Sequence, residues 1–181
     1  AYLIQQMDIL TEFAQKLGEQ EKAAYWKAEA DELYGRLMEK MYNGDRFFAR
    51  KLREPETVLS TSSLILCLPL VLSYRYPKEV TKKLVAQLEN ELEATYGLAT
   101  EALDSPYYKE DGYWLGPIWA PVSYIVIDAL YKAGYQEAGD RLAKKFCEMT
   151  LIGGMAENYN AETGNGNDDL AFAWSSSVFL L

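Results

Sequence analysis

Glu157 is the acidic residue whose neighbours point most directly to chemistry. It lies in the segment MAENYNAETGNGN at residues 155–167, whose glycines and asparagines are typical of a loop. It follows the apolar pair Met155-Ala156, so we expect its backbone to leave a partly buried position. Asn158 and Tyr159 follow it and are predicted to orient its carboxylate by hydrogen bonds. Such a carboxylate is suited to general acid or base catalysis, and a solvated loop charge is the alternative reading.

The other acids of this segment are predicted to have plainer roles. A tight turn is expected at residues 163–166, and Glu162 beside it is predicted to be exposed to solvent. Asp168 and Asp169 precede the last apolar segment and are expected to cap the helix there.

Two tryptophans mark a second candidate loop, YKEDGYWLGPIWAP at residues 108–121. Trp114 and Trp119 flank Gly116-Pro117, a pair that predicts a turn between them. Indole rings fixed in this way are able to stack on the apolar C–H faces of a sugar ring. The alternative is that both rings only anchor the loop to the core.

Composition narrows the classes of function. A net charge of −9 and a pI near 4.6 argue against a nucleic-acid partner, which would require a basic face. The chain has no histidine, so acid–base work falls to carboxylates or tyrosine, and we expect no cofactor and no metal ion. The 14 tyrosines and 4 tryptophans suit a polar, flat ligand, and we expect no membrane partner. Cys67 and Cys147 are predicted to be buried apolar residues.

The segments that flank and position these loops are predicted to be helices. Apolar spacing predicts them over residues 3–17, 19–42, 64–72, 76–94, 121–134, 137–151 and 174–181. Three of these, at 64–72, 121–134 and 174–181, are apolar on every side and must be enclosed. From residue 64 onward, enclosed and amphipathic helices alternate, as two concentric layers require.

The connections alternate as well. Those at residues 43–59, 95–120 and 152–173 are long, and those between them are short, so every long loop should lie on one face. No period-2 strand pattern is found, which predicts an all-α domain forming part of an α/α toroid. A solenoid of helical hairpins would show a sequence repeat, and none is clear.

Three runs in this order, YWLGPIWAPVSY, MAENYNAETGNG and FAWSS, resemble the C-terminal third of the family 63 glycoside hydrolases. These enzymes are related to the mannosylglycerate and glucosylglycerate hydrolases and, more distantly, to the family 37 trehalases. A YWRGPIW-like loop, an EN-Y-D-TG loop and an F-W-[ST] helix start recur there on an (α/α)6 barrel. The segment AYLIQQMDILTEFAQKLGEQEKAAYWKAEADEL is similar to the hairpin that precedes those motifs.

The resemblance implies an inverting hydrolase that acts on an α-glycosidic bond of a carbohydrate substrate. Glu157 then corresponds to the general base that takes a proton from the attacking water. The residues expected to bind the sugar are Trp114, Gly116, Trp119, Asn158, Tyr159 and Trp174.

Departures from the family pattern concern both loops and the general acid. Leu115 stands where the family has arginine, and Asn160 stands where it has aspartate. The family's general acid belongs to a motif resembling SG-[WM]-D-x-SP, which this chain lacks. Asp104, in the string Asp104-Ser105-Pro106, is a weak substitute, better read as a turn carboxylate.

We therefore expect residues 1–181 to be the C-terminal portion of one (α/α)6 catalytic domain, with about seven helices present. Its N-terminal side is expected to be incomplete, with the general acid before Ala1 and no activity in the isolated segment. A non-catalytic sugar-binding or scaffolding domain that lacks the acid is the alternative. An (α/α)6 sugar epimerase is a third reading, disfavoured because those enzymes use histidines and this chain has none.

Overall fold

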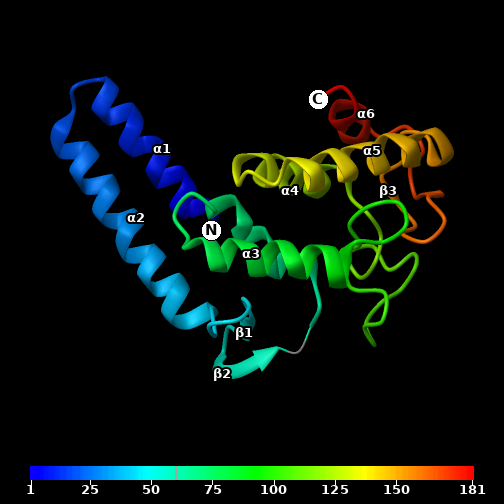
Figure 1. Ribbon diagram of the computed structural model, residues 1–181, viewed down its shortest axis with the longest axis horizontal. Coiled ribbons are helices and arrows are strands. Elements are labelled where there is room, and N and C mark those ends of the chain that lie inside the picture. The colour runs from blue at the N-terminus through cyan, green and yellow to red at the C-terminus, as the bar shows by residue number, and fades with distance from the viewer. Residues whose placement is uncertain (60) are drawn as a thin grey trace.

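Two long antiparallel helices open the chain. The computed structural model describes residues 1–59 and 61–181, and its first elements are α1 (Tyr2–Lys16) and α2 (Gln20–Met41) (Figure 1). Gly18 lies just beyond α1 with a φ of +76°, the left-handed conformation that glycine adopts most readily at a helix end. The stop predicted at this glycine is confirmed.

The third apolar segment is not an α-helix, contrary to the expectation for residues 64–72. It forms two successive 3₁₀ helices, η1 (Leu64–Leu66) and η2 (Leu68–Leu72). Pro69 explains the difference, because it has no N–H to donate to the carbonyl of Ile65 in an α-helix. Leu70 and Leu72 are fully buried as predicted, whereas Ile65 is exposed.

The remaining helices agree with the predicted segments. They are α3 (Lys78–Gln87), its π-helical continuation η3 (Leu88–Leu92), α4 (Ala120–Lys132), α5 (Gln136–Gly153) and α6 (Ala173–Phe179). Pro77 stands at the N-cap of α3, and α4 carries Pro121 in its first turn. Within the described part of the chain, no helix combines the length and apolar character needed to cross a membrane.

The helices form the two predicted layers. α4 packs against both η2 and α6, and α1 also packs against η2, so these four elements form one continuous series. Among the amphipathic helices, α2 packs on α1, α3 on η2 and α5 on α4, so each contacts a member of that series. The main core lies where the layers meet and includes Leu84, Leu88, Val126 and Leu130.

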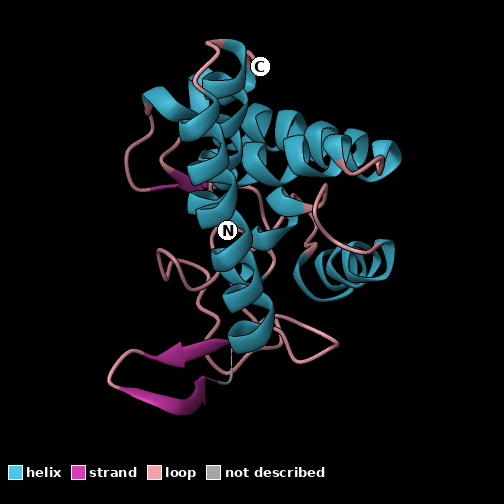
Figure 2. Cartoon of the chain, turned by 90° about the vertical axis from the view of Figure 1, so that its left-hand side faces the viewer, coloured by secondary structure: helices cyan, strands magenta, loops and turns pink. Residues whose placement is uncertain are grey.

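Two small β-pairs were missed by the sequence analysis, which expected no strands. β1 (Ala49–Lys51) pairs antiparallel with β2 (Glu54–Leu59), and Figure 2 shows this hairpin projecting from the helices. β3 (Asn158–Tyr159) pairs antiparallel with β4 (Gly166–Asn167). Most of β2 is exposed on both faces, so its sequence has no alternation of apolar and polar residues to recognise.

The two cysteines differ in their environment. Cys67 is buried as predicted, and burial raises the pKa of its thiol to about 12, so it is not a thiolate at neutral pH. Cys147 is exposed on α5, so the prediction of burial was wrong for this residue. The apolar residues around it, Phe146 and Met149, occupy the buried positions of that helix turn instead.

Candidate active site

The three long connections meet on one face of the helices. The chain that leads from the first connection into η1 joins the second through hydrogen bonds from Leu64 N to Thr100 O (2.9 Å) and from Ala102 N to Ser62 O (3.1 Å). The second and third join through two bonds between Ile118 and Tyr159, of 2.7 and 3.0 Å. Figure 1 shows the second and third connections side by side beyond the ends of α3 and α5. The prediction that the loops share a face is therefore confirmed.

Glu157 is held through its backbone on both sides. Its N–H donates to the carbonyl of Asp169 (2.7 Å), and its own carbonyl accepts the indole N–H of Trp174 (3.1 Å). Ala156 before it and Asn158 after it are fully buried, while Glu157 itself is half-buried. The carboxylate therefore leaves a rigid, buried backbone and reaches the surface, as predicted from the Met155-Ala156 pair.

Tyr113 contacts the Glu157 carboxylate directly. Its hydroxyl donates to Oε1 of Glu157 at 2.9 Å, and this hydrogen bond raises the pKa of the Tyr113 phenol. Tyr113 has a φ of +60°, which is rare for a residue with a side chain and is often found at functional sites. Tyr113 was not among the residues expected to act at the site, although it directly precedes Trp114 in the aromatic motif.

Asn158 and Tyr159 do not orient the Glu157 carboxylate, so that prediction was wrong. Asn158 donates to Asp168 Oδ2 (2.7 Å) and accepts from Asn167 Nδ2 (3.1 Å). The hydroxyl of Tyr159 donates to the Gly154 carbonyl (2.8 Å), and burial raises the pKa of this phenol. Both side chains are fully buried, so they fix the loop from beneath its surface.

The tryptophans form one cluster above this loop. Trp114 stacks on Trp119 with ring centroids 4.0 Å apart and an interplanar angle of 8°. Trp119 meets the edge of Trp174 at 5.4 Å, and its indole N–H donates to the Tyr113 carbonyl at 2.8 Å. Trp119 is 1% exposed and Trp114 is 47% exposed, so Trp114 is the member of the stacked pair that solvent and ligands can reach.

Gly116 is required by the close approach of two chain segments. A Cβ at this position would lie 2.4 Å from the Lys109 carbonyl oxygen and 2.7 Å from the Tyr108 ring. Thr100 fixes the turn, because its hydroxyl accepts from Gly116 N (3.0 Å) and donates to the Pro117 carbonyl (2.9 Å). Gly116 is buried and shapes the loop from within.

The other predicted residues occupy less central positions. Glu162 and Asp104 are exposed, as expected. Asn160 accepts the amides of Glu162 and Thr163 at 2.9 and 3.0 Å and closes a turn at residues 161–163. The turn predicted at residues 163–166 is therefore displaced toward the N-terminus, because Gly166 belongs to β4.

The capping prediction for Asp168 and Asp169 was wrong, because the N-cap of α6 is Phe172. Asp168 instead accepts from Asn158, and Asp169 accepts the amide of Ala171 (3.0 Å).

Comparison with known proteins places this arrangement in a family. The model for the "Mannosylglycerate hydrolase MGH1-like glycoside hydrolase domain" matches residues 1–175. Mannosylglycerate hydrolase MGH2 of Selaginella moellendorffii is 30% identical over 88 residues, which are 49% of this chain and 18% of that protein. Mannosylglycerate hydrolase of Thermus thermophilus is 29% identical over 87 residues, which are 48% of this chain and 21% of that protein.

Solved structures show the fold. A GH63 mannosylglycerate hydrolase from Thermus thermophilus, in complex with glucose, matches 94% of this chain and 41% of its own, with a TM-score of 0.78 and 21% identity. Neutral trehalase Nth1 of Saccharomyces cerevisiae matches 99% of this chain and 35% of its own, with a TM-score of 0.77 and 20% identity. The chain thus has the fold of part of an (α/α)6 toroid and spans less than half the length of these relatives.

Proposed function

Because the chain belongs to the mannosylglycerate hydrolase MGH1-like family of glycoside hydrolases, we propose that the protein hydrolyses an α-glycosidic bond. We propose further that the reaction inverts the configuration at the anomeric carbon and that Glu157 is its general base. The observation that carries the proposal is the placement of Glu157. Its backbone is fixed by Asp169 and Trp174, its carboxylate is held by Tyr113, and the exposed indole of Trp114 belongs to the same cluster.

The chemistry proposed for Glu157 is the activation of water. The carboxylate accepts a proton from a water molecule as the water oxygen attacks the anomeric carbon of the sugar. The bond from that carbon to the glycosidic oxygen breaks, and a general acid on the other side of the sugar protonates the leaving oxygen. We propose that this acid is supplied by a part of the protein upstream of Ala1.

The remaining residues divide into contacting and positioning groups in this proposal. Trp114 offers an exposed indole on which a pyranose ring stacks, and Trp174 lies half-buried at the edge of the same cluster. Trp119 supports the stacked ring of Trp114 from below. Gly116, Asn158 and Tyr159 are buried, so we assign them to the shape of the two loops.

The test is Glu157→Gln in the full-length protein. Turnover of α-glucosides, α-mannosides or trehalose should fall by at least about a hundredfold, the usual contribution of a general base, while substrate binding survives. Glu162→Gln is the matched control, because it changes an exposed glutamate of the same loop and should leave turnover within twofold of wild type.

The stereochemistry of the product is an independent check. NMR of the first-formed anomer should show inverted configuration, and retention would exclude the role proposed for Glu157. A wild-type protein that binds these sugars without turnover would favour the alternative, a non-catalytic carbohydrate-binding domain.

A further inference from the structure

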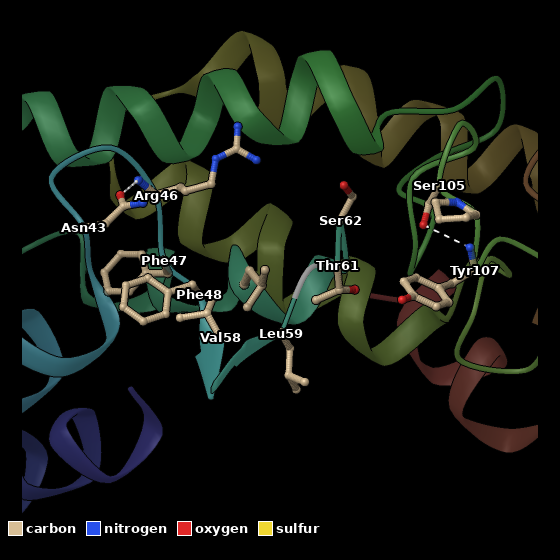
Figure 3. Close-up of a pocket in the computed structure, with 12 residues that line it drawn as sticks. Asn43, Arg46, Phe47, Phe48, Val58, Leu59, Thr61, Ser62, Ser105 and Tyr107 are labelled. Carbon is tan, nitrogen blue, oxygen red and sulfur yellow. Dashed lines mark hydrogen bonds between the residues drawn. The ribbon is translucent and has the colours of Figure 1, made fainter. Parts of the chain in front are cut away.

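A cavity of about 500 Å³ lies between the first and second long connections, on the loop face but outside the Glu157 cluster. Figure 3 shows Phe47, Phe48 and Val58 on one side, Ser105 and Tyr107 on the other, and Thr61 and Ser62 between them. A cavity of this volume is within the range of small-molecule sites in proteins.

One buried carboxylate joins the middle of the cavity to the side that carries Ser105. Glu101 is 1% exposed and accepts the Thr61 hydroxyl (2.9 Å), the Ser62 amide (3.1 Å) and the Ser105 hydroxyl (2.6 Å). A buried carboxylate costs free energy unless it is well hydrogen-bonded, so these hydrogen bonds fix Ser105 relative to Thr61 and Ser62.

The cavity offers no available positive charge. Among its described lining residues, Arg46 is the cationic one, and both of its terminal nitrogens donate to Glu91, at 2.8 and 3.3 Å. Asp45 lies 4.0 Å from the Arg46 Nε. With two carboxylates around one guanidinium, the cavity does not favour an anionic ligand.

The lining favours a ligand with both hydroxyl groups and apolar C–H faces. The half-buried ring of Phe48 and the 52% exposed ring of Tyr107 supply aromatic surface, and Thr61, Ser62 and Ser105 supply polar atoms between them. This is the combination by which proteins bind neutral sugar rings.

We propose that this cavity binds a neutral sugar unit of the substrate, beyond the two units that are joined by the bond that is cut. The inference rests on the glycosidase function proposed above and narrows its substrate class to α-glycosides extended by an uncharged sugar. The second connection links the two places, since Tyr107 lines the cavity and Tyr113 holds Glu157.

The experiment measures sugar affinity by calorimetry in full-length Glu157→Gln protein, in which turnover is blocked. The probes are maltose, maltotriose and mannosylglycerate, which represent a short neutral, an extended neutral and an anionic glycoside. Tyr107→Ala in this background should weaken maltotriose binding about three- to tenfold, the usual effect of one aromatic contact. Maltose and mannosylglycerate affinities should stay within twofold. Tyr25→Ala is the matched control, an exposed tyrosine on α2 that should change none of the three.

Equal maltotriose affinity in the parent and in Tyr107→Ala, or no maltotriose binding in the parent, would overturn the proposal. The proposal would also be overturned if Tyr107→Ala weakened mannosylglycerate binding more than maltotriose binding, because the cavity would then hold the anionic group. A separate measurement tests the function proposed for Glu157. If turnover persists in the single Glu157→Gln variant, the general-base role is wrong.

Discussion

Tyr113 is the residue whose position the sequence did not predict and on which the geometry at Glu157 depends most. Its hydroxyl is 2.9 Å from the carboxylate, and its carbonyl accepts the Trp119 indole N–H. One residue therefore connects the proposed base to the aromatic cluster. Its φ of +60° is maintained by these contacts, because the conformation is unfavourable for a tyrosine alone.

Tyr113→Phe should remove the hydrogen bond and keep the ring. We expect kcat of the full-length protein to fall about three- to tenfold, corresponding to roughly 1 kcal/mol for one hydrogen bond, with a smaller change in KM. Steady-state kinetics test this, with Tyr25→Phe on α2 as the control. A change in KM alone would show that Tyr113 contacts substrate instead of positioning Glu157.

At the scale of elements, the second connection depends on one glycine. Gly116→Ala would place a methyl group against the Lys109 carbonyl, so we expect a loss of about 2 kcal/mol or more in the free energy of unfolding. Urea denaturation measures it. Gly35→Ala is the matched control inside α2, where no atom lies within 4 Å, and it should stabilise by about 0.5–1 kcal/mol. Equal effects of the two substitutions would contradict the close approach at Gly116.

The hairpin formed by α1 and α2 is held to the rest of the fold by ion pairs. Arg75, in the link between η2 and α3, bonds to Asp8 on α1 (Nε to Oδ2, 2.7 Å) and to Asp31 on α2 (2.9 Å). Partial burial opposes ionisation of Asp8, but hydrogen bonds from Arg75 and Tyr74 outweigh it and hold the Asp8 pKa below its usual range. The ionised form is therefore the one that stabilises the folded chain.

Asp8→Asn should cost about 1–2 kcal/mol of unfolding free energy at pH 7, less than a fully buried pair. Because the folded-state pKa of Asp8 is below its unfolded value of about 3.9, this contribution is present above that pH and is lost as the pH falls through the folded pKa. The gap between wild type and Asp8→Asn in urea midpoint should thus close below about pH 4. Glu148→Gln, in an exposed pair with Lys144, is the control and should change stability by less than about 0.5 kcal/mol. A gap that persists unchanged at acidic pH would refute the role of the Asp8 charge.

The order of helices was predictable from the sequence, and the contacts of the site were not. Apolar spacing decides which faces are buried, and it located α1 to α6 because each buries one face or all of its surface. Hydrogen-bond partners depend on which loops meet. The side-chain amide of Asn158 is able to donate a hydrogen bond to either Glu157 or Asp168. The pairing of β3 with β4 brings it to Asp168.

At the scale of the whole molecule, large apolar side chains are exposed on three members of the series formed by α1, η2, α4 and α6. Leu3 and Phe13 of α1 are exposed, as are Tyr124 of α4 and Phe179 at the end of α6. Exposed apolar groups on several packed elements are typical of surfaces that another protein segment covers. We therefore propose that further parts of the toroid pack there.

The chain of 181 residues expressed alone should accordingly self-associate and show no hydrolysis of α-glycosides. Light scattering coupled to size-exclusion chromatography measures the first property, and glycosidase assays measure the second. Replacing Leu3 and Phe13 by serine should reduce association, whereas replacing the solitary exposed Leu52 of the β1–β2 turn should not. A monodisperse wild-type monomer would contradict the proposal.

The stacked pair Trp114 and Trp119 also gives the protein an optical signature. Indoles whose ring centroids are 4.0 Å apart couple their electronic transitions, and rotation of one ring relative to the other within the stacked planes gives the pair an exciton couplet in circular dichroism. Trp119 also lies 5.4 Å from Trp174, so Trp114→Phe should weaken and reshape the couplet, leaving the part due to Trp119 and Trp174, while the helical bands persist. A sugar that binds to Trp114 would alter the same couplet, so circular dichroism would detect binding at the site without a label.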